Sequence, residues 1–146
     1  MDNNLTKERL QDSFEQKSWT EIKASSSWQI FKIMAEFVEG FEKLSRIGPC
    51  VSIFGSARTT ADNPIYTVTA QTAAALAEQG YMVVTGAGPG IMEAGMVGAG
   101  RANSIGVSIR LPFETGANSV IAGDEKYVSM RYFFTRKLML VKESHA

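Results

Sequence analysis

The chain has 146 residues, enough for one domain of ordinary size, and its 45% hydrophobic residues are sufficient for a globular core. Its 15 Lys and Arg residues balance its 15 Asp and Glu residues, so no overall positive charge indicates a nucleic-acid partner. No signal peptide or apolar stretch of ~20 residues is present, and the single cysteine, Cys50, excludes an internal disulfide. We therefore expect a cytoplasmic protein, without a membrane partner, in which Cys50 is a buried, inert thiol.

The first 48 residues are predicted to form a helical extension. Residues 1–18 are polar and weakly patterned, whereas helical periodicity extends from Trp19 to Arg46 and ends at Gly48-Pro49. One stripe of this helix is formed by Trp28, Phe31, Met34 or Ala35, Val38, Phe41 or Glu42, and Ser45. We expect the stripe to pack against the domain or against a partner subunit.

From residue 49 onward, short apolar runs alternate with helical segments. Strands are predicted at Cys50–Phe54, Tyr81–Thr85, Ser104–Ile109 and Tyr127–Ser129. Helices are predicted from Pro64, capped by Asn63, to about Gln79, and over Ile91–Arg101 and Arg131–Lys142. This alternation predicts an α/β fold with a doubly wound parallel sheet and right-handed crossovers.

Two loops containing glycine follow the first two predicted strands, at the sheet edge where open parallel sheets bind ligands. One begins with Gly55 and Ser56, and the other consists of Gly86, Ala87, Gly88, Pro89 and Gly90. Glycines let the backbone approach an oxyanion, and N–H groups near Gly90, Ile91 and Met92 would point at it from the start of a helix. The pattern predicts a phosphate site; the alternative is a tight strand-to-helix turn without a ligand.

Other nucleotide sites fit this sequence less well. In the dinucleotide pattern G-x-G-x-x-G the third glycine would stand at Ile91, and no acidic residue ends the next strand. The absence of Gly-Lys-Ser/Thr after the loop excludes a P-loop. Farther along, Arg136 lies within an apolar helix stripe, where an arginine either extends to solvent or meets a buried anion.

Five segments closely match, in order and spacing, the motifs of the Lonely Guy family. They are Phe54–Arg58, Thr85–Ala94, Ser104–Gly106, Leu111–Glu114 and Tyr132–Lys137. The resemblance covers about residues 49–146 and implies a Rossmann-like domain. It also implies hydrolysis of the N-glycosidic bond of a nucleoside 5′-monophosphate, a cytokinin ribotide or an ordinary nucleotide, to free base and ribose 5-phosphate.

The resemblance further implies which residues act. Glu114, Arg136 and Lys137 would bind substrate together with the two glycine loops, and Arg136 would take part in catalysis. No metal or cofactor is implied, and members are usually homodimers with the active site near the subunit interface.

The sequence departs from the family pattern in two places. Ala87 replaces the middle of three glycines, which we expect to place a methyl group where the ligand approaches. The chain also stops at Ala146, before the family's Pro-Gly-Gly-x-Gly-Thr-x-x-Glu motif with its catalytic glutamate. We therefore expect an incomplete sheet and little hydrolytic activity, with Glu93 and Glu114 as the nearest carboxylates.

Two other functions compete with hydrolysis. One is a non-catalytic module that binds a nucleotide or phosphate. The other is pyridoxal-phosphate-dependent lysine decarboxylation, which is disfavoured because neither Lys137 nor Lys142 has a setting suited to a Schiff base.

Overall fold

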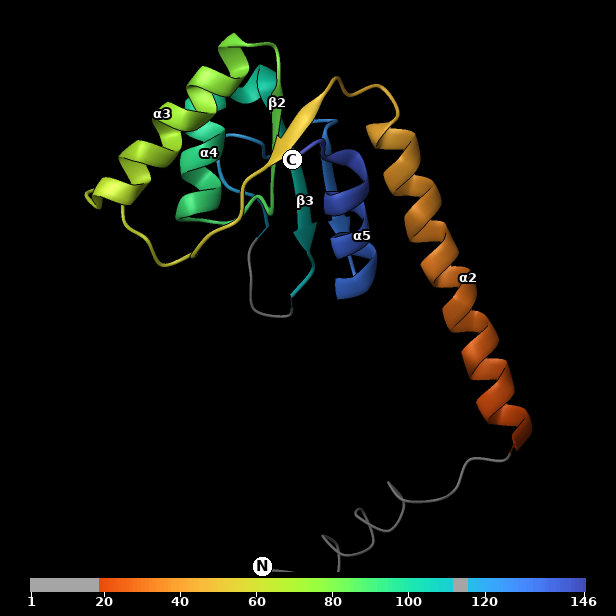
Figure 1. Cartoon of the computed structure of the whole chain (residues 1–146). Helices are drawn as coiled ribbons and strands as arrows, with labels where there is room; N and C mark the ends of the chain where they lie inside the picture. Colours follow the sequence, from red (N-terminus) through yellow and green to blue (C-terminus); the bar gives the residue numbers. More distant parts are fainter. Residues whose placement is uncertain (1–18, 112–115) are drawn as a thin grey trace, which may run out of the picture. The chain divides into compact units, whose positions relative to one another are not determined.

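A computed structural model describes residues 19–111 and 116–146 of the chain. These residues contain a four-stranded parallel sheet in the order β1-β2-β3-β4 (Figure 1). The strands are β1 (Cys50–Ser52), β2 (Met82–Thr85), β3 (Ser104–Ile109) and β4 (Tyr127–Met130). The helices are α2 (Trp19–Leu44), α3 (Pro64–Glu78), α4 (Ile91–Ala99) and α5 (Phe133–Glu143), with a 3₁₀ turn, η1 (Arg101–Asn103), before β3.

Each strand and helix predicted between residues 50 and 146 is present, with its ends shifted by a few residues. The start of α3 shows why this part of the sequence is informative. The Asn63 side chain accepts the Ile65 N–H group at 2.9 Å, and Pro64 occupies the first helical turn, where a missing N–H group costs no hydrogen bond.

The winding direction of the sheet reverses at β1. The chain first moves away from β1 through parallel pairs such as Val51 with Val83 in β2. Helix α5 then returns from β4, and on the other side of β1 the His145 N–H group donates to the Cys50 carbonyl at 2.8 Å. The Ser52 N–H group donates to the Ala146 carbonyl, also at 2.8 Å. The predicted doubly wound α/β fold is therefore confirmed.

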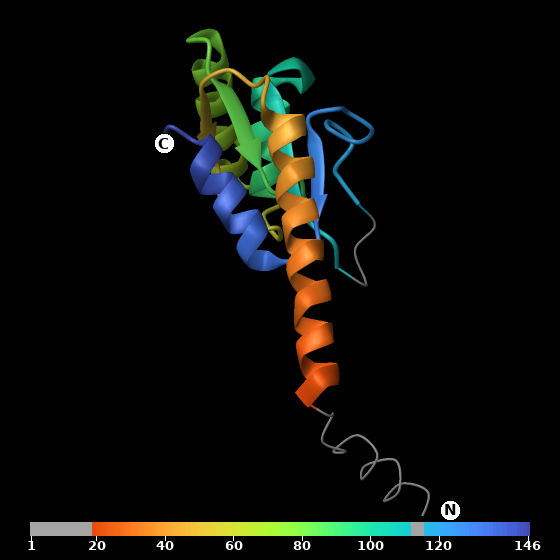
Figure 2. The ribbon, with the colours of Figure 1, turned by 90° about the vertical axis from the view of Figure 1, so that its right-hand side faces the viewer.

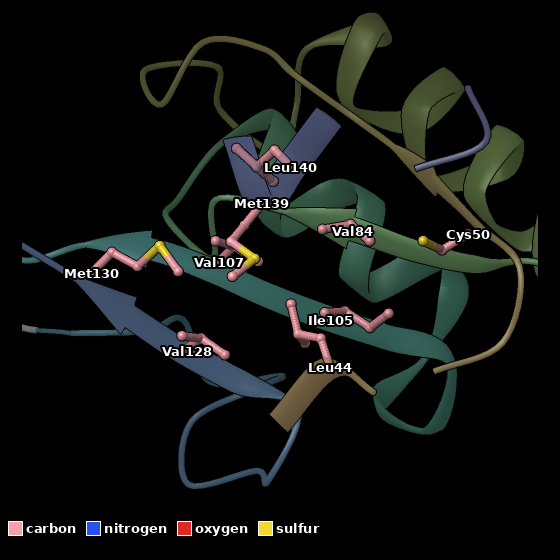
Figure 3. Packing of buried hydrophobic residues seen from close by; sticks show 9 residues of the cluster. All are labelled: Leu44, Cys50, Val84, Ile105, Val107, Val128, Met130, Met139 and Leu140. Atoms are coloured by element: carbon pink, nitrogen blue, oxygen red, sulfur yellow. The ribbon is translucent and has the colours of Figure 1, made fainter. Parts of the chain in front are cut away.

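The sheet lies between helices on both faces: α3 and α4 cover one face (Figure 1), and α5 lies in front of the other (Figure 2). Successive residues of β2 face opposite sides: Val83 packs with Ala73 of α3, whereas Val84 belongs to the larger cluster beneath α5. That larger cluster, shown in Figure 3, contains Leu44, Cys50, Val84, Ile105, Val107, Val128, Met130, Met139 and Leu140. Because successive side chains of a strand point to opposite faces, β2 contributes residues to the clusters on both sides of the sheet.

The chain divides into two compact units, Met1–Met34 and Ala35–Ala146, and residues 35–44 of α2 belong to the unit that contains the sheet. In this part of α2, Gly40 and Leu44 are buried, whereas Val38 is 63% exposed. The Met139 and Met130 methyl groups occupy the space that a side chain at Gly40 would need. At Val38 the predicted stripe therefore does not pack on the domain, because Gly40 allows closer approach on another face of the helix; packing of the stripe on a partner subunit stays a prediction.

The division of the chain into a helical extension, 1–48, and a nucleotide-binding domain, 49–146, stays a prediction. In the part of the chain that the structure describes, no helix is long and apolar enough to cross a bilayer. Cys50 is fully buried, as expected, and its Sγ donates to the Glu143 carbonyl at 2.7 Å. Burial, and secondarily the charge of Glu143, raises the pKa of the thiol, which keeps it protonated and unreactive at neutral pH.

Candidate functional site

A cavity of about 390 Å³ opens at the carboxyl ends of the parallel strands. Its volume lies within the ~300–1,000 Å³ usual for small-molecule sites. The glycine loop and α4 contribute Gly86, Gly88, Pro89 and Met92, and α5 contributes Phe133 and Arg136. The rest of the lining that the structure describes is Ala57, Ser108, Ile109, Arg110, Leu111, Gly116, Tyr127 and Ser129. The glycine loop and the predicted catalytic arginine therefore meet at one cavity.

The glycine loop is held from behind by hydrogen bonds. Thr85 Oγ1 accepts the Ala87 N–H group at 3.0 Å, and the Asn118 N–H group donates to the Ala87 carbonyl at 2.8 Å. The Asn118 side chain also donates to the Gly88 carbonyl at 3.1 Å. These bonds fix the backbone shape of the loop without using its cavity face.

Ala87 adopts a left-handed conformation, with φ of 59°, which is uncommon for a residue with a side chain. Its methyl group is 1% exposed and packs with Met96 and Ile121. The expectation that this methyl meets the ligand is therefore wrong. The loop turns the side chain into the core, so the replaced glycine leaves the cavity unobstructed.

The first glycine loop supports the second. The Ser56 carbonyl accepts the Ile91 N–H group at 3.1 Å. The prediction that this N–H group points at a ligand is therefore wrong. A side chain at Gly90, whose φ is 70°, would collide with the same carbonyl, and one at Gly55 would collide with Ile91. Ile91 itself is 6% exposed. Gly55 and Ser56 thus lie behind the α4 N-terminus, whereas Ala57, which follows them, lines the cavity.

Arg136 points across the end of the sheet to the glycine loop. Its Nε donates to the Val107 carbonyl at 2.9 Å, and its Nη2 occupies the position where a side chain at Gly86 would start. An arginine that extended to solvent would not bond a strand carbonyl in this way. The neighbouring Lys137 is exposed and lies outside the described lining, and Glu114 lies outside the described residues.

The charge of the described lining is positive. It contains Arg110 and Arg136 and no carboxylate. Glu93 is absent from this lining and lies near Tyr66 of α3: burial raises the pKa of the Tyr66 hydroxyl, and the charge of Glu93 raises it further. Two arginines and a helix N-terminus at one cavity are groups that attract an anion.

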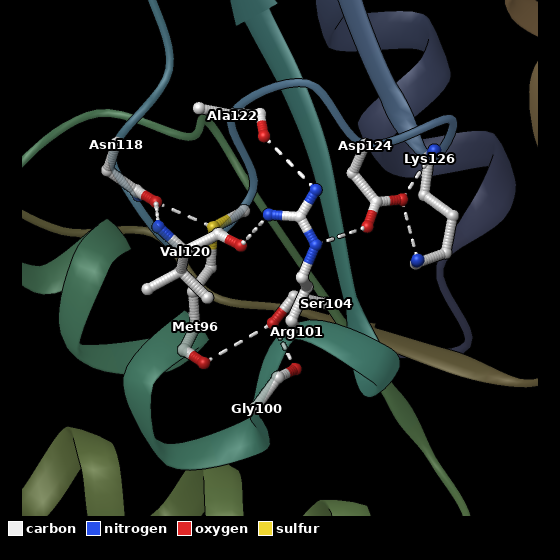
Figure 4. A network of polar contacts seen from close by, with 9 residues as sticks. All are labelled: Met96, Gly100, Arg101, Ser104, Asn118, Val120, Ala122, Asp124 and Lys126. Atoms are coloured by element: carbon white, nitrogen blue, oxygen red, sulfur yellow. Dashed lines mark hydrogen bonds and ion pairs between the residues drawn. The ribbon is translucent and has the colours of Figure 1, made fainter.

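A polar network, not predicted from the sequence, holds the segment between β3 and β4 (Figure 4). Arg101 donates to the carbonyls of Val120, at 2.9 Å, and Ala122, at 3.1 Å, and its Nε lies 3.0 Å from an Asp124 carboxylate oxygen. Asp124 also pairs with the Lys126 ammonium at 2.6 Å. The network anchors the segment that contains Asn118. No local sequence pattern predicts the contacts of Arg101, because its partners are distant in sequence.

A pair of hydroxyl groups was also missed. Ser108 Oγ and the Tyr127 hydroxyl lie 2.7 Å apart, and both residues line the cavity from adjacent strands. Ser and Tyr are common strand residues, so neither stands out until the strand register brings them together.

The reversal of the sheet at β1 and the glycine loop at its edge define a Rossmann-like, nucleotide-related α/β module. A family model, described as the SLOG cluster4 family, matches residues 49–131. The match covers more than half of the chain, which therefore belongs to this family. The SLOG superfamily is Rossmann-like and includes the Lonely Guy proteins that the motifs resemble. A search of curated proteins finds no match.

Proposed function

We propose that the cavity binds a nucleoside 5′-monophosphate, with the phosphate against the Gly86–Gly90 loop. The main support is the Arg136 guanidinium, which lies on Gly86 in a cavity that the glycine loop and Arg110 also line. A guanidinium matches phosphate oxygens in charge and geometry, and the nearby start of α4 adds a favourable dipole. Apart from Arg110, the remaining described lining is a mixture of hydroxyl and apolar groups, suited to a sugar and a base.

Calorimetric titration of the whole chain with AMP, adenosine and inorganic phosphate tests this proposal. AMP should bind more tightly than either of the other two, because only AMP presents both the phosphate and the sugar-base part. Arg136→Ala should weaken AMP binding roughly 10- to 100-fold, since it removes hydrogen bonds to a charged group. Other nucleoside monophosphates and a cytokinin ribotide then rank the preferred base.

Arg131→Ala is the matched control. It removes the same side chain from a nearby exposed position outside the described lining, so AMP affinity should not change. Equal AMP affinity of wild type and Arg136→Ala would contradict the proposed phosphate position.

Hydrolysis of the N-glycosidic bond is the more specific second proposal. The motif match at residues 132–137 and the place of Arg136 in the cavity support it. The reaction passes through an oxocarbenium-like state that a carboxylate stabilises. Arginine stays protonated and is a poor base, so it would hold the phosphate or the sugar hydroxyls.

With AMP as substrate, we expect turnover by the 146-residue chain to stay below ~1 s⁻¹, a rate typical of a working enzyme. Release of ribose 5-phosphate measures the rate. A faster turnover would contradict this expectation, and Glu114→Gln would then test whether Glu114 supplies the carboxylate. In a form that turns over, Arg136→Ala should reduce turnover far more than it reduces thermal stability.

A further inference from the structure

The Ser108–Tyr127 hydroxyl pair is built by the packing around Gly106. In the pairing of β3 with β4, Gly106 lies opposite Tyr127, and Ser108 lies opposite Ser129. A side chain at Gly106 would come within 2.9 Å of the Tyr127 ring, so the glycine lets the ring lie close to β3. From there the phenol reaches Ser108 Oγ, 2.7 Å away.

The pair lines the same cavity as the groups that would hold the phosphate. Ser108 and Tyr127 share this lining with Gly86 and Gly88 of the glycine loop and with Arg136 of α5. The Tyr127 ring packs beside the buried Ala87 methyl group, and its hydroxyl reaches Ser108 near the end of β3. A phosphate at the loop and a sugar at the two hydroxyls would therefore occupy one cavity.

The hydrogen-bonding capacity of the pair exceeds what the two residues use between themselves. Each hydroxyl has one proton to donate and two lone pairs to accept, and their mutual bond uses one proton and one lone pair. One proton and several lone pairs therefore remain. A sugar hydroxyl, which both donates and accepts, matches this remainder, whereas phosphate oxygens only accept. Ser108 is 8% exposed, so a polar partner there is valuable.

We propose that Ser108 and Tyr127 form a sugar subsite that distinguishes ribose from deoxyribose in the bound nucleotide. This inference rests on the proposed binding of a nucleoside 5′-monophosphate and specifies its sugar. Ribose hydroxyls would accept the remaining proton of the pair and donate to its remaining lone pairs. A deoxyribose would leave one of these groups without a partner inside the cavity.

The test compares the affinities of AMP, 2′-deoxy-AMP and 3′-deoxy-AMP for the whole chain. Wild type should prefer AMP over at least one deoxy analogue by roughly 3- to 10-fold, the effect of one neutral hydrogen bond. Tyr127→Phe, which keeps the packed ring, and Ser108→Ala should each reduce this ratio to about 1. The affinity for inorganic phosphate should stay unchanged, because the loop and Arg136 are intact.

Tyr81→Phe is the control: it removes a phenol hydroxyl outside the described lining and should preserve the preference for AMP. Equal binding of the three nucleotides by wild type would overturn the inference while leaving nucleotide binding in place. An unchanged AMP preference in both Tyr127→Phe and Ser108→Ala would also overturn it. No AMP binding by wild type would overturn the proposed function, and the sugar subsite with it.

Discussion

At Gly86 the absence of a side chain leaves room for the ends of two others. A Cβ there would collide with Arg136 Nη2 and lie 2.7 Å from Met92 Sδ, both at the ends of flexible side chains. The φ of Gly86 is not positive, so alanine suits its backbone. We predict that Gly86→Ala folds with little change in Tm but binds AMP roughly tenfold more weakly, because the guanidinium is displaced.

Thermal melting and calorimetry of the same samples separate these two effects. Gly48→Ala is the control, since nothing lies within 4 Å of the added methyl group. A Gly86→Ala variant that binds AMP as tightly as wild type would show that the observed guanidinium position is not needed for binding.

Asp124 is the residue where pH should affect stability. Its carboxylate accepts hydrogen bonds from the Lys126 N–H group at 3.0 Å and ammonium at 2.6 Å, and it pairs with Arg101. The bond from Lys126, followed by its charge and that of Arg101, lowers the pKa of Asp124. A lowered folded-state pKa means that the stabilisation is present above the unfolded value, about 3.9, and is lost as pH falls through the folded value.

We therefore predict that Asp124→Ala reduces the free energy of unfolding by about 1–3 kcal/mol at pH 7, because Arg101 and Lys126 lose their charged hydrogen-bond acceptor. The difference from wild type should shrink as the pH falls below about 4. Urea denaturation at several pH values measures both effects, with the exposed Glu125→Ala as control. A difference that does not depend on pH would rule out the ionised carboxylate as its source.

At the scale of the elements, a carboxylate of α2 joins the residue before α5 to the first turn of α5. Glu36 Oε1 accepts the Arg131 N–H group at 2.6 Å, and its Oε2 accepts the hydroxyl of the fully buried Thr135 at 2.9 Å. A negative charge near a helix N-terminus also interacts favourably with the helix dipole. Because α5 contains Arg136, this Glu36 contact also supports the cavity.

Glu36→Ala should lower the free energy of unfolding by about 1–2 kcal/mol, and it should weaken AMP binding by loosening the start of α5. Glu39→Ala is the control. Glu39 lies on the same helix, but its exposed ion pair with Lys43 contributes little to stability. If the two variants were equally stable in denaturant titrations, the Glu36 contact would have no measurable role.

At the scale of the whole molecule, helices α2 and α5 expose an apolar surface on one side of the second compact unit. Leu138 and Val141 are 48% and 72% exposed, and Val38 is 63% exposed. The Lys142 ammonium lies 4.7 Å from the Phe41 ring centre, which shows that the two helices adjoin. Contiguous apolar surface often marks a protein interface, and a two-fold dimer buries the same surface on both copies.

The family resemblance implies a homodimer, and we propose that a second copy of the chain covers this surface. Sedimentation should show a dimer for wild type and a monomer for Leu138→Glu. Val97→Glu places the same charge at a similarly exposed position on α4, on the opposite side of the sheet, and should remain dimeric. A monomeric wild type, or a dimeric Leu138→Glu variant, would contradict the proposed interface.

The order and type of the elements could be predicted because their signals are local. Asn63-Pro64 starts a helix through its own side chain and ring, and the run from Ser104 to Ile109 is apolar enough to form a buried strand. Their alternation is typical of a doubly wound sheet, which brings the glycine loop to the edge where ligands bind. The sequence alone therefore determined the fold class and the neighbourhood of the candidate site.

The tertiary structure decided which groups actually face the cavity. It turns the Ala87 methyl into the core, engages the Ile91 N–H group with Ser56, and joins Ser108 to Tyr127. Each outcome depends on a neighbour distant in sequence or on the left-handed backbone at one residue. A local pattern contains neither, because side-chain direction and hydrogen-bond partners are set only when strands pair and helices pack. For the same reason, the buried face of α2 follows from the close approach at Gly40, not from its most apolar stripe.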